Sequence, residues 1–260
     1  MPNYETSVAD GQVNNDVPTS EPPTQGEWDT VHDAVTGDDV WNDGVSGYIA
    51  RAEHKGGSYD EYDINRSFFY FDTTGVSGIA EVRLHLYLYG KSTNECILVA
   101  MEGTQADTLT TANFDSFTGT KFGHVTCVED AWNTIVFNAL GASKINDAGI
   151  TKICVREYVH DYLDVRPEEN EEYHASGYYA ENAALIPYLE VTTTTGESIK
   201  IRKLVSTLIL KGETVGVGHQ LRFRKYGTTF GLSLVATADA NASPFRIWDG
   251  SAVKAVEKVV

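Results

Sequence analysis

Strict alternation of apolar and polar side chains over residues 80–90, AEVRLHLYLYG, is the feature that most constrains the fold. Side chains two positions apart on an extended strand point to the same face, so this stretch has one apolar and one polar face. The apolar set is Val82, Leu84, Leu86 and Leu88, and the opposite set is Glu81, Arg83, His85, Tyr87 and Tyr89. We therefore predict a half-buried strand that covers a hydrophobic core.

Short runs with strand character recur along the chain, and turn residues separate them. They span residues 46–51, 63–73, 95–101, 124–128, 133–138, 150–158 and 185–193. No long amphipathic helical pattern lies between them, and the abundance of Tyr, Val, Thr and Gly favours strands and turns. We expect an all-β fold, namely an antiparallel jelly-roll-type β-sandwich plus a small C-terminal β module.

Charge and proline content divide the chain into parts. Residues 1–195 carry 10 Lys and Arg against 32 Asp and Glu, whereas residues 196–260 carry 10 against 5. Residues 1–26 are acidic and rich in proline, which predicts an extended arm that becomes ordered only against another surface. We therefore expect an N-terminal arm at 1–26, a jelly-roll sandwich at 27–194 and a small basic β module at 195–260.

Composition argues against several classes of function. The net charge of −17 disfavours binding to nucleic acid or anionic lipid. No stretch approaches the ~18 apolar residues of a membrane span, and the N-terminus lacks the features of a signal peptide. Cys96, Cys127 and Cys154 lie in apolar runs, which favours buried free thiols, with one disulfide plus one free thiol as the alternative.

Catalytic signatures are missing from the sequence. It contains no H-E-x-x-H metal motif, no G-x-S-x-G nucleophile turn and no G-x-x-x-x-G-K-[ST] phosphate loop. A pair of carboxylates could hydrolyse a glycoside, but the 37 acidic residues leave no pair singled out. We expect a protein that is not an enzyme and needs no cofactor, apart from an optional structural Ca²⁺.

Three strand motifs carry a first resemblance. They are RSFFYFD at 66–72, AEVRLHLY at 80–87 and INDAGITKICVR at 145–156. Together they resemble β-sandwich modules of the DNRLRE type, which occur on extracellular and surface proteins and are related to carbohydrate-binding modules. The resemblance implies the sandwich fold and says little about the ligand.

The end of the chain carries a second resemblance. Residues 228–260 read TTFGLSLVATADANASPFRIWDGSAVKAVEKVV. This segment resembles C-terminal segments of tailed-phage virion proteins. The two resemblances together imply a sandwich module carried on a virion.

Exposed tyrosines are the strongest binding signal. A pyranose ring has an apolar C–H face that stacks on aromatic rings, while carboxylates and amides bind its hydroxyl groups. The candidate ligand-binding residues are Tyr87, Tyr89, Tyr158, Tyr162, Tyr178 and Tyr179. The alternative is that these tyrosines pack on neighbouring loops or subunits.

Two further groups of charged residues are candidate sites, one for a cation and one for a protein partner. Asp38, Asp39 and Asp43 cluster in a turn-rich loop and could hold Ca²⁺, although solvated loop acids look the same in sequence. In the C-terminal module, a basic docking face could dock onto an acidic protein surface, and a solvated strand face is the alternative. Its residues are Arg202, Lys203, Arg222, Arg224 and Lys225.

The leading hypothesis is a non-enzymatic structural component of a bacteriophage virion, such as a capsid decoration, head fibre or spike protein. Its arm and C-terminal module would contact the major capsid protein or another virion protein. A homo-oligomer, which we take as a trimer, would display the sandwich, with cell-surface glycan as a further partner. The alternative is a carbohydrate-binding module or cell-surface adhesion domain of a bacterial extracellular protein. We expect no nucleic-acid or membrane partner.

Overall fold

The computed structural model describes residues 3–6, 9–42, 44–56 and 60–193 in full, together with the backbone of short strands between 200 and 255. The chain divides into two units, Met1–Thr194 and Thr195–Val260. We call the first of them unit 1 and the second unit 2.

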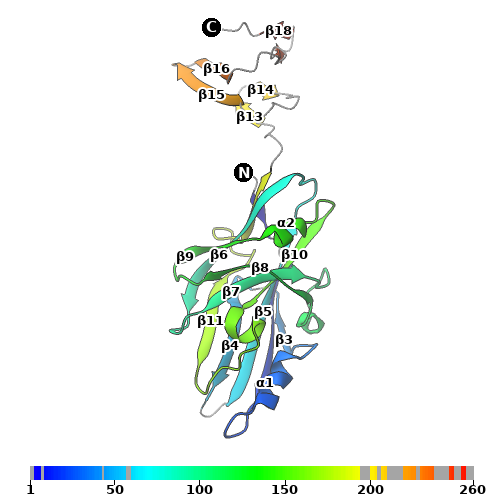
Figure 1. The fold of residues 1–260 in the computed structure, drawn as a ribbon, viewed down its shortest axis with the longest axis vertical. Coiled ribbons are helices and arrows are strands. Elements are labelled where there is room, and N and C mark those ends of the chain that lie inside the picture. The colour runs from blue at the N-terminus through cyan, green and yellow to red at the C-terminus, as the bar shows by residue number, and fades with distance from the viewer. Residues whose placement is uncertain are drawn as a thin grey trace. The chain divides into compact units, whose positions relative to one another are not determined.

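Unit 1 is built from antiparallel strands that form one curled, sandwich-like sheet system (Figure 1). The strands are β1 (Asn3–Glu5), β2 (Gly11–Pro18), β3 (Asp39–Trp41), β4 (Ser46–Lys55), β5 (Glu61–Asp72), β6 (Ile79–Lys91), β7 (Ile97–Gly103), β8 (Phe117–Thr126), β9 (Ala131–Val136), β10 (Ile150–Glu157), β11 (Glu172–Tyr178) and β12 (Tyr188–Thr193). Their order is β1-β12-β6-β11-β4-β5-β10-β7-β8, with β2 paired to β3 and β5, and β9 paired to β6. The expected all-β fold class is confirmed.

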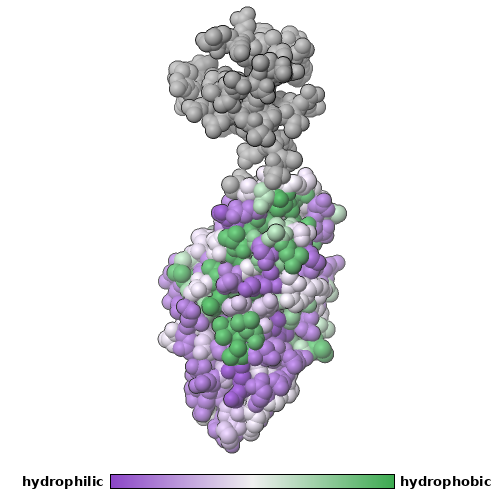
Figure 2. Space-filling view, viewed as in Figure 1, coloured by the Kyte–Doolittle hydropathy of each residue, from purple (hydrophilic) through white to green (hydrophobic). Residues whose placement is uncertain are grey.

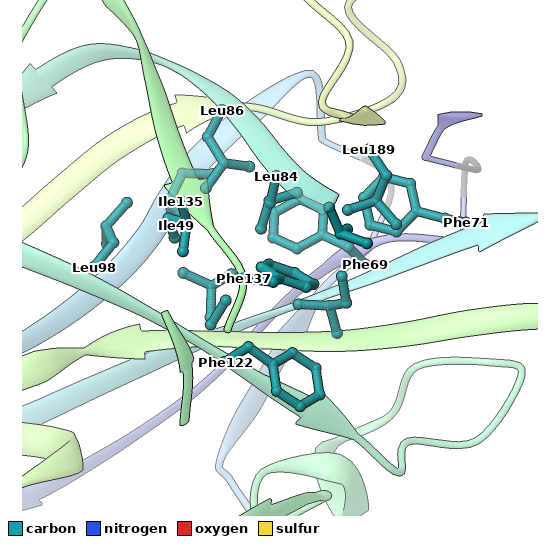
Figure 3. Close-up of a cluster of buried hydrophobic side chains, with 14 of the residues drawn as sticks. Ile49, Phe69, Phe71, Leu84, Leu86, Leu98, Phe122, Ile135, Phe137 and Leu189 are labelled. Atoms are coloured by element: carbon teal, nitrogen blue, oxygen red, sulfur yellow. The ribbon is translucent and has the colours of Figure 1, made fainter. Parts of the chain in front are cut away.

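The alternation in β6 fixes the main core. Leu84 and Leu86 are buried on its inner face, where they meet Phe69 of β5 and Ile135 of β9 (Figure 3). Burying an aliphatic or aromatic side chain of this size stabilises a fold by about 1.5–3 kcal/mol. Because the leucines of β6 are packed in the core, the strand is held in place and its other face is a stable part of the surface.

A second cluster lies on the opposite face of β5. Short helical segments help to form the structure: α1 (Gln25–His32), α2 (Ala139–Ser143), the single turn η1 (Thr111–Asn113) and the π-helical turn η2 (Tyr158–Tyr162). Trp28 and Val31 of α1 pack in this cluster with Ile64 of β5. Thr24 is the N-cap that precedes α1, and it forms a capping box with Glu27. The Thr24 side chain accepts from the Glu27 N–H, and the Glu27 side chain accepts from the Thr24 N–H.

The N-terminal segment contributes strands to unit 1. Residues 11–18 form β2, which pairs with β5 from Gly11↔Phe68 to Pro18↔Glu61, while β1 pairs with β12. Val13 is buried in the second cluster. The surface against which this acidic, proline-rich segment becomes ordered is therefore the chain's own sheet.

Unit 2 consists of three hairpins in its described part. The strands are β13 (Lys200–Lys203), β14 (Ser206–Ile209), β15 (His219–Tyr226), β16 (Thr229–Ala236), β17 (Arg246–Trp248) and β18 (Val253–Ala255). Each odd-numbered strand pairs antiparallel with the next one. This agrees with the expected β character of the C-terminal part.

The surface of unit 1 is mostly hydrophilic on the face that Figure 2 shows, as the excess of acidic residues predicts, with separate apolar patches. The described helices are too short to span a lipid bilayer. Cys96, Cys127 and Cys154 are free and buried, which confirms the first of the two interpretations of the cysteines.

Candidate binding surface

The outer face of β6 gathers aromatic residues from three neighbouring strands. In the β6–β9 ladder Tyr87 stands opposite Trp132, and in the β6–β12 ladder His85 stands opposite Tyr188. Directly opposed residues in antiparallel strands share a face, so these side chains meet outside the core. We call Tyr87, Tyr89, Trp132, Tyr178, Tyr188 and His85 the aromatic platform.

The rings of the platform touch one another in a continuous series. Trp132 lies edge-on to Tyr87 at 5.7 Å between ring centroids and to Tyr188 at 5.3 Å. Tyr178 lies 6.0 Å from Tyr87 and 5.0 Å from Tyr89. Aromatic pairs favour such tilted and edge-to-face geometries, so each ring holds its neighbour in place.

A glycine and a bulge bring Tyr178 to this face. The pairing of β11 with β6 shifts register between Ser176 and Gly177. A Cβ atom on Gly177 would come within 2.7 Å of both the Tyr87 carbonyl oxygen and Ile49 Cγ1. Only glycine permits so close an approach, and the bulge redirects the side chains that come after it.

A polar side chain fixes the turn before Trp132. Asn133 Oδ1 accepts a hydrogen bond from the Val128 N–H at 2.8 Å, and its Nδ2 donates to the carbonyls of Val128 and Ala131. Asn133 is itself buried. The turn that presents Trp132 is thus tied to the body of the sheet.

Charged groups border the rings. His85 hydrogen-bonds to Thr134 Oγ1 at 3.0 Å and to Glu190 Oε2 at 3.1 Å. Arg83 lies 3.8 Å from the same Glu190 oxygen. A carboxylate and a guanidinium beside the stacked His85 and Tyr188 rings supply both the acceptors and the donors that hydroxyl groups require.

Solvent reaches the platform. The Trp132 residue is 40% exposed and Tyr89 is 38% exposed, although both are large aromatics. Partial burial raises the pKa of Tyr188, with the charge of Glu190 as a smaller cause. The platform therefore offers neutral aromatic surface to solvent, stabilised from below by the core.

The six tyrosines predicted from sequence fall into three places. Tyr87, Tyr89 and Tyr178 come together on the platform. Tyr158 and Tyr162 lie elsewhere, at η2, where Tyr158 stacks on Tyr162 at 5.6 Å and on His124 at 4.9 Å. They form a second, separate aromatic group.

Tyr179 is a correction to the sequence prediction. It is 1% exposed, and its hydroxyl donates to the Tyr48 carbonyl at 2.7 Å and hydrogen-bonds to Ser67 Oγ at 2.7 Å. Successive residues of an extended chain point to opposite faces, so Tyr178 is at the surface and Tyr179 is in the core. Burial raises the pKa of Tyr179 well above its ordinary value.

Sequence reasoning missed Trp132 and Tyr188. Both lie on alternating strands, with Ile135 inward on β9 and Leu189 inward on β12. The alternation alone could have assigned each ring to an outer face. It could not show that both strands flank β6, because those pairings join residues far apart in sequence.

Two of the three predicted cation ligands, Asp38 and Asp39, accept hydrogen bonds from backbone N–H groups through their carboxylates. Asp38 Oδ2 accepts from the Asp16 N–H at 3.1 Å, and Asp39 Oδ1 accepts from the Val40 N–H at 2.9 Å. Asp43 lies outside the described residues. Calcium binding by this loop stays a prediction.

The predicted docking residues lie on strands of unit 2. Arg202 and Lys203 belong to β13, and Arg222, Arg224 and Lys225 belong to β15. Their side chains lie outside the part of the chain that is described in full, so the docking face also stays a prediction.

Unit 1 also contains a buried cluster of charged and aromatic residues, which we call the ionic cluster. Arg66 Nη2 donates to Asp161 Oδ1 at 2.7 Å, and Arg156 Nε donates to Asp161 Oδ2 at 2.8 Å. The Phe114 ring lies 4.0 Å from the Arg66 guanidinium, and the Phe117 ring lies 4.3 Å from that of Arg156. Although burial opposes ionisation, the two guanidinium groups hold the pKa of Asp161 well below its usual range.

Comparison with known proteins gives no assignment: no family model matches the chain, and no curated protein matches it either. Function is therefore inferred from the platform and from the sequence.

Proposed function

We propose that unit 1 is a non-enzymatic binding module that binds a glycan at its aromatic platform. The observation that carries this proposal is the continuous series of rings on the outer face of β6, in which Trp132 and Tyr89 are exposed and Glu190 borders the series at His85. Aromatic rings cover the C–H face of a pyranose, and the charged border takes its hydroxyl groups.

The shape of the platform favours an extended ligand. Its rings come from β12, β9, β6 and β11, so the aromatic surface runs across the strands. A surface of this kind supports binding of several successive sugar units better than enclosure of a single one, because each ring can contact a different unit. An oligosaccharide or polysaccharide is the ligand class that fits.

We further propose that the chain is a structural component of a bacteriophage virion, carried there as a capsid decoration, head fibre or spike protein. The resemblance of residues 228–260 to tailed-phage virion proteins supports this placement. Unit 2 would then provide the contacts with the capsid and with other copies of the chain, while unit 1 faces the cell surface. The rival placement, an adhesion module of a bacterial extracellular protein, uses the same platform.

A glycan array tests the binding proposal. The full chain should bind a subset of immobilised oligosaccharides, and Tyr87→Ala together with Trp132→Ala should abolish that binding. Retained binding by this double variant, or no binding to any glycan of a broad array, would count against the proposal.

Co-purification tests the virion proposal separately. The chain should be present in purified phage particles and should bind capsids that lack it, and a variant without residues 228–260 should not. Absence from particles, with glycan binding intact, would favour the extracellular alternative.

A further inference from the structure

Four carboxylates form a row across one face of the sheet, away from the platform. Asp16 of β2 stands opposite Asp63 of β5, Asp63 stands opposite Glu53 of β4, and Glu53 stands opposite Glu172 of β11. Like charges that oppose one another directly destabilise a sheet. Such a row requires compensating positive charge.

Two basic side chains compensate Asp63 and Glu53, the two middle members of the row. Lys55 Nζ lies 2.7 Å from Asp63 Oδ2 and 3.4 Å from Glu53 Oε1, and Arg51 Nη1 lies 3.5 Å from the same Glu53 oxygen. Both cations therefore approach Glu53 through Oε1. The second oxygen, Oε2, is left for His174 of β11.

Three side chains with metal-binding atoms meet at that second oxygen. His174 Nδ1 lies 3.3 Å from Glu53 Oε2, and the ligand atoms of Glu53, Glu172 and His174 all lie within 4.8 Å of one another. A distance of 3.3 Å is long for a hydrogen bond to a carboxylate. It equals the separation of about 3.3 Å between two ligands of a tetrahedral cation with bonds of about 2.0 Å.

The histidine is held in place by its neighbours. The Ser92 N–H donates to the His174 carbonyl at 2.9 Å, and the His174 N–H donates to Ser92 Oγ at 3.1 Å. The Tyr48 ring packs edge-on to the imidazole at 5.2 Å. The Ser92 bonds hold the backbone of His174, and the Tyr48 ring packs against its imidazole.

A further oxygen beside Glu53 has no partner among the described residues. Asp63 is 3% exposed, and its Oδ1 is buried without a hydrogen bond, as is Oδ1 of Asn65 two residues along the same strand face. Asp63 stands opposite Glu53 on the side of β4 away from Glu172, and its other oxygen, Oδ2, pairs with both Lys55 and Arg51. A buried carboxylate oxygen without a donor is costly, and the charge of Asp63 is offset by Lys55 and Arg51.

We propose that Glu53, Glu172 and His174 form a binding site for a divalent transition-metal cation of the Zn²⁺ class. An imidazole nitrogen with two carboxylates suits Zn²⁺ better than Ca²⁺, which takes 6–8 oxygen ligands. The site links β4 to β11 by side chains and is independent of glycan binding by the platform.

Calorimetric titration of the full chain with ZnCl₂, after removal of bound metal with a chelator, tests this site. We expect one Zn²⁺ per chain at this site, with CaCl₂ and MgCl₂ giving no comparable heat. Glu172→Gln and His174→Gln should each weaken Zn²⁺ binding by at least about tenfold. Zn²⁺ should also raise the melting temperature of the native chain and not that of either variant.

Matched controls separate this site from adventitious binding. Glu169→Gln alters a nearby exposed carboxyl, and His124→Gln alters an exposed histidine of β8. Both should bind Zn²⁺ as the native chain does. The proposal is wrong if Zn²⁺ does not bind, if Glu172→Gln and His174→Gln bind as tightly as the controls, or if Ca²⁺ binds equally well at the same residues.

Discussion

The aromatic platform and the ionic cluster both combine aromatic rings with charged groups, but the cluster is buried and the platform is open to solvent. Around Asp161, the rings of Phe114 and Phe117 cover the guanidinium groups, and both carboxylate oxygens are taken by Arg66 and Arg156. On the platform, the rings cover one another and leave their remaining surface to solvent. Aromatic residues next to charged groups can bind a ligand only where they are not already buried in contacts within the fold.

Two tryptophans, Trp28 in the core and Trp132 on the platform, illustrate the difference. Trp28 packs in the second cluster against Tyr62 and His32, and its Nε1 donates to Asp164 at 2.9 Å. Trp132 contacts two tyrosines and remains 40% exposed. Removal of the first kind of residue should affect stability, and removal of the second kind should affect binding.

The largest expected effect is on the ionic cluster. Asp161→Asn leaves Arg66 and Arg156 buried without a counter-charge, which should lower the free energy of unfolding by about 3–5 kcal/mol. Urea denaturation at neutral pH measures this. A loss below about 1 kcal/mol, the size expected of an exposed ion pair, would show that the cluster does not hold the fold together.

A pH dependence should follow from the neighbouring Glu157. Burial raises the pKa of Glu157 to about 7. The folded chain thus keeps a proton that the unfolded chain releases near its ordinary pKa of about 4.3, so stability should decline as the pH rises from about 4.5 to 7. Each pKa unit corresponds to about 1.4 kcal/mol, so the full effect is on the order of 3 kcal/mol.

The comparison with Glu157→Gln isolates that contribution. The variant carries no charge at this position, so its stability relative to the native chain should increase as the pH rises from about 5 to about 8. Thermal melts of both proteins across this range measure the difference. A difference that stays constant with pH would contradict the raised pKa.

A smaller effect is expected within the platform. Tyr178→Ala removes a ring that contacts Tyr87 and Tyr89, so affinity for a glycan selected on the array should fall by about 1 kcal/mol, or several-fold. Tyr158→Ala, in the separate group at η2, is the matched control and should bind normally. Equal losses in both variants would place the binding site elsewhere.

Local patterns in the sequence predicted more of the fold than of the site. The alternation in β6 correctly assigned its leucines to the core and Tyr87 and Tyr89 to the outer face. Trp132 and Tyr188 could not be added, because their positions depend on the pairing of β9 and β12 with β6. Tyr179 was misplaced for a related reason: the bulge at Gly177 and the burial of Tyr179 are set by tertiary contacts.

The buried ionic cluster was beyond sequence reasoning for the same physical reason. Arg66 and Asp161 are separated by 95 positions, and each looks like an ordinary surface charge in its own segment. The group that we propose as a metal site likewise depends on the register between β4 and β11. Strand identity is a local property of the chain, whereas the partners across a sheet are not.

The central claim, that the platform binds glycan, is tested most directly by paired tryptophan variants. Trp132→Ala removes the ring that joins Tyr87 to Tyr188, and Trp41→Ala removes a 51% exposed ring of β3 that is not part of the platform. Calorimetric titration with the glycan selected on the array should show at least a tenfold weaker Kd for Trp132→Ala, or about 1.4 kcal/mol, and an unchanged Kd for Trp41→Ala. An unchanged Kd for Trp132→Ala, with its melting temperature intact, would contradict the claim.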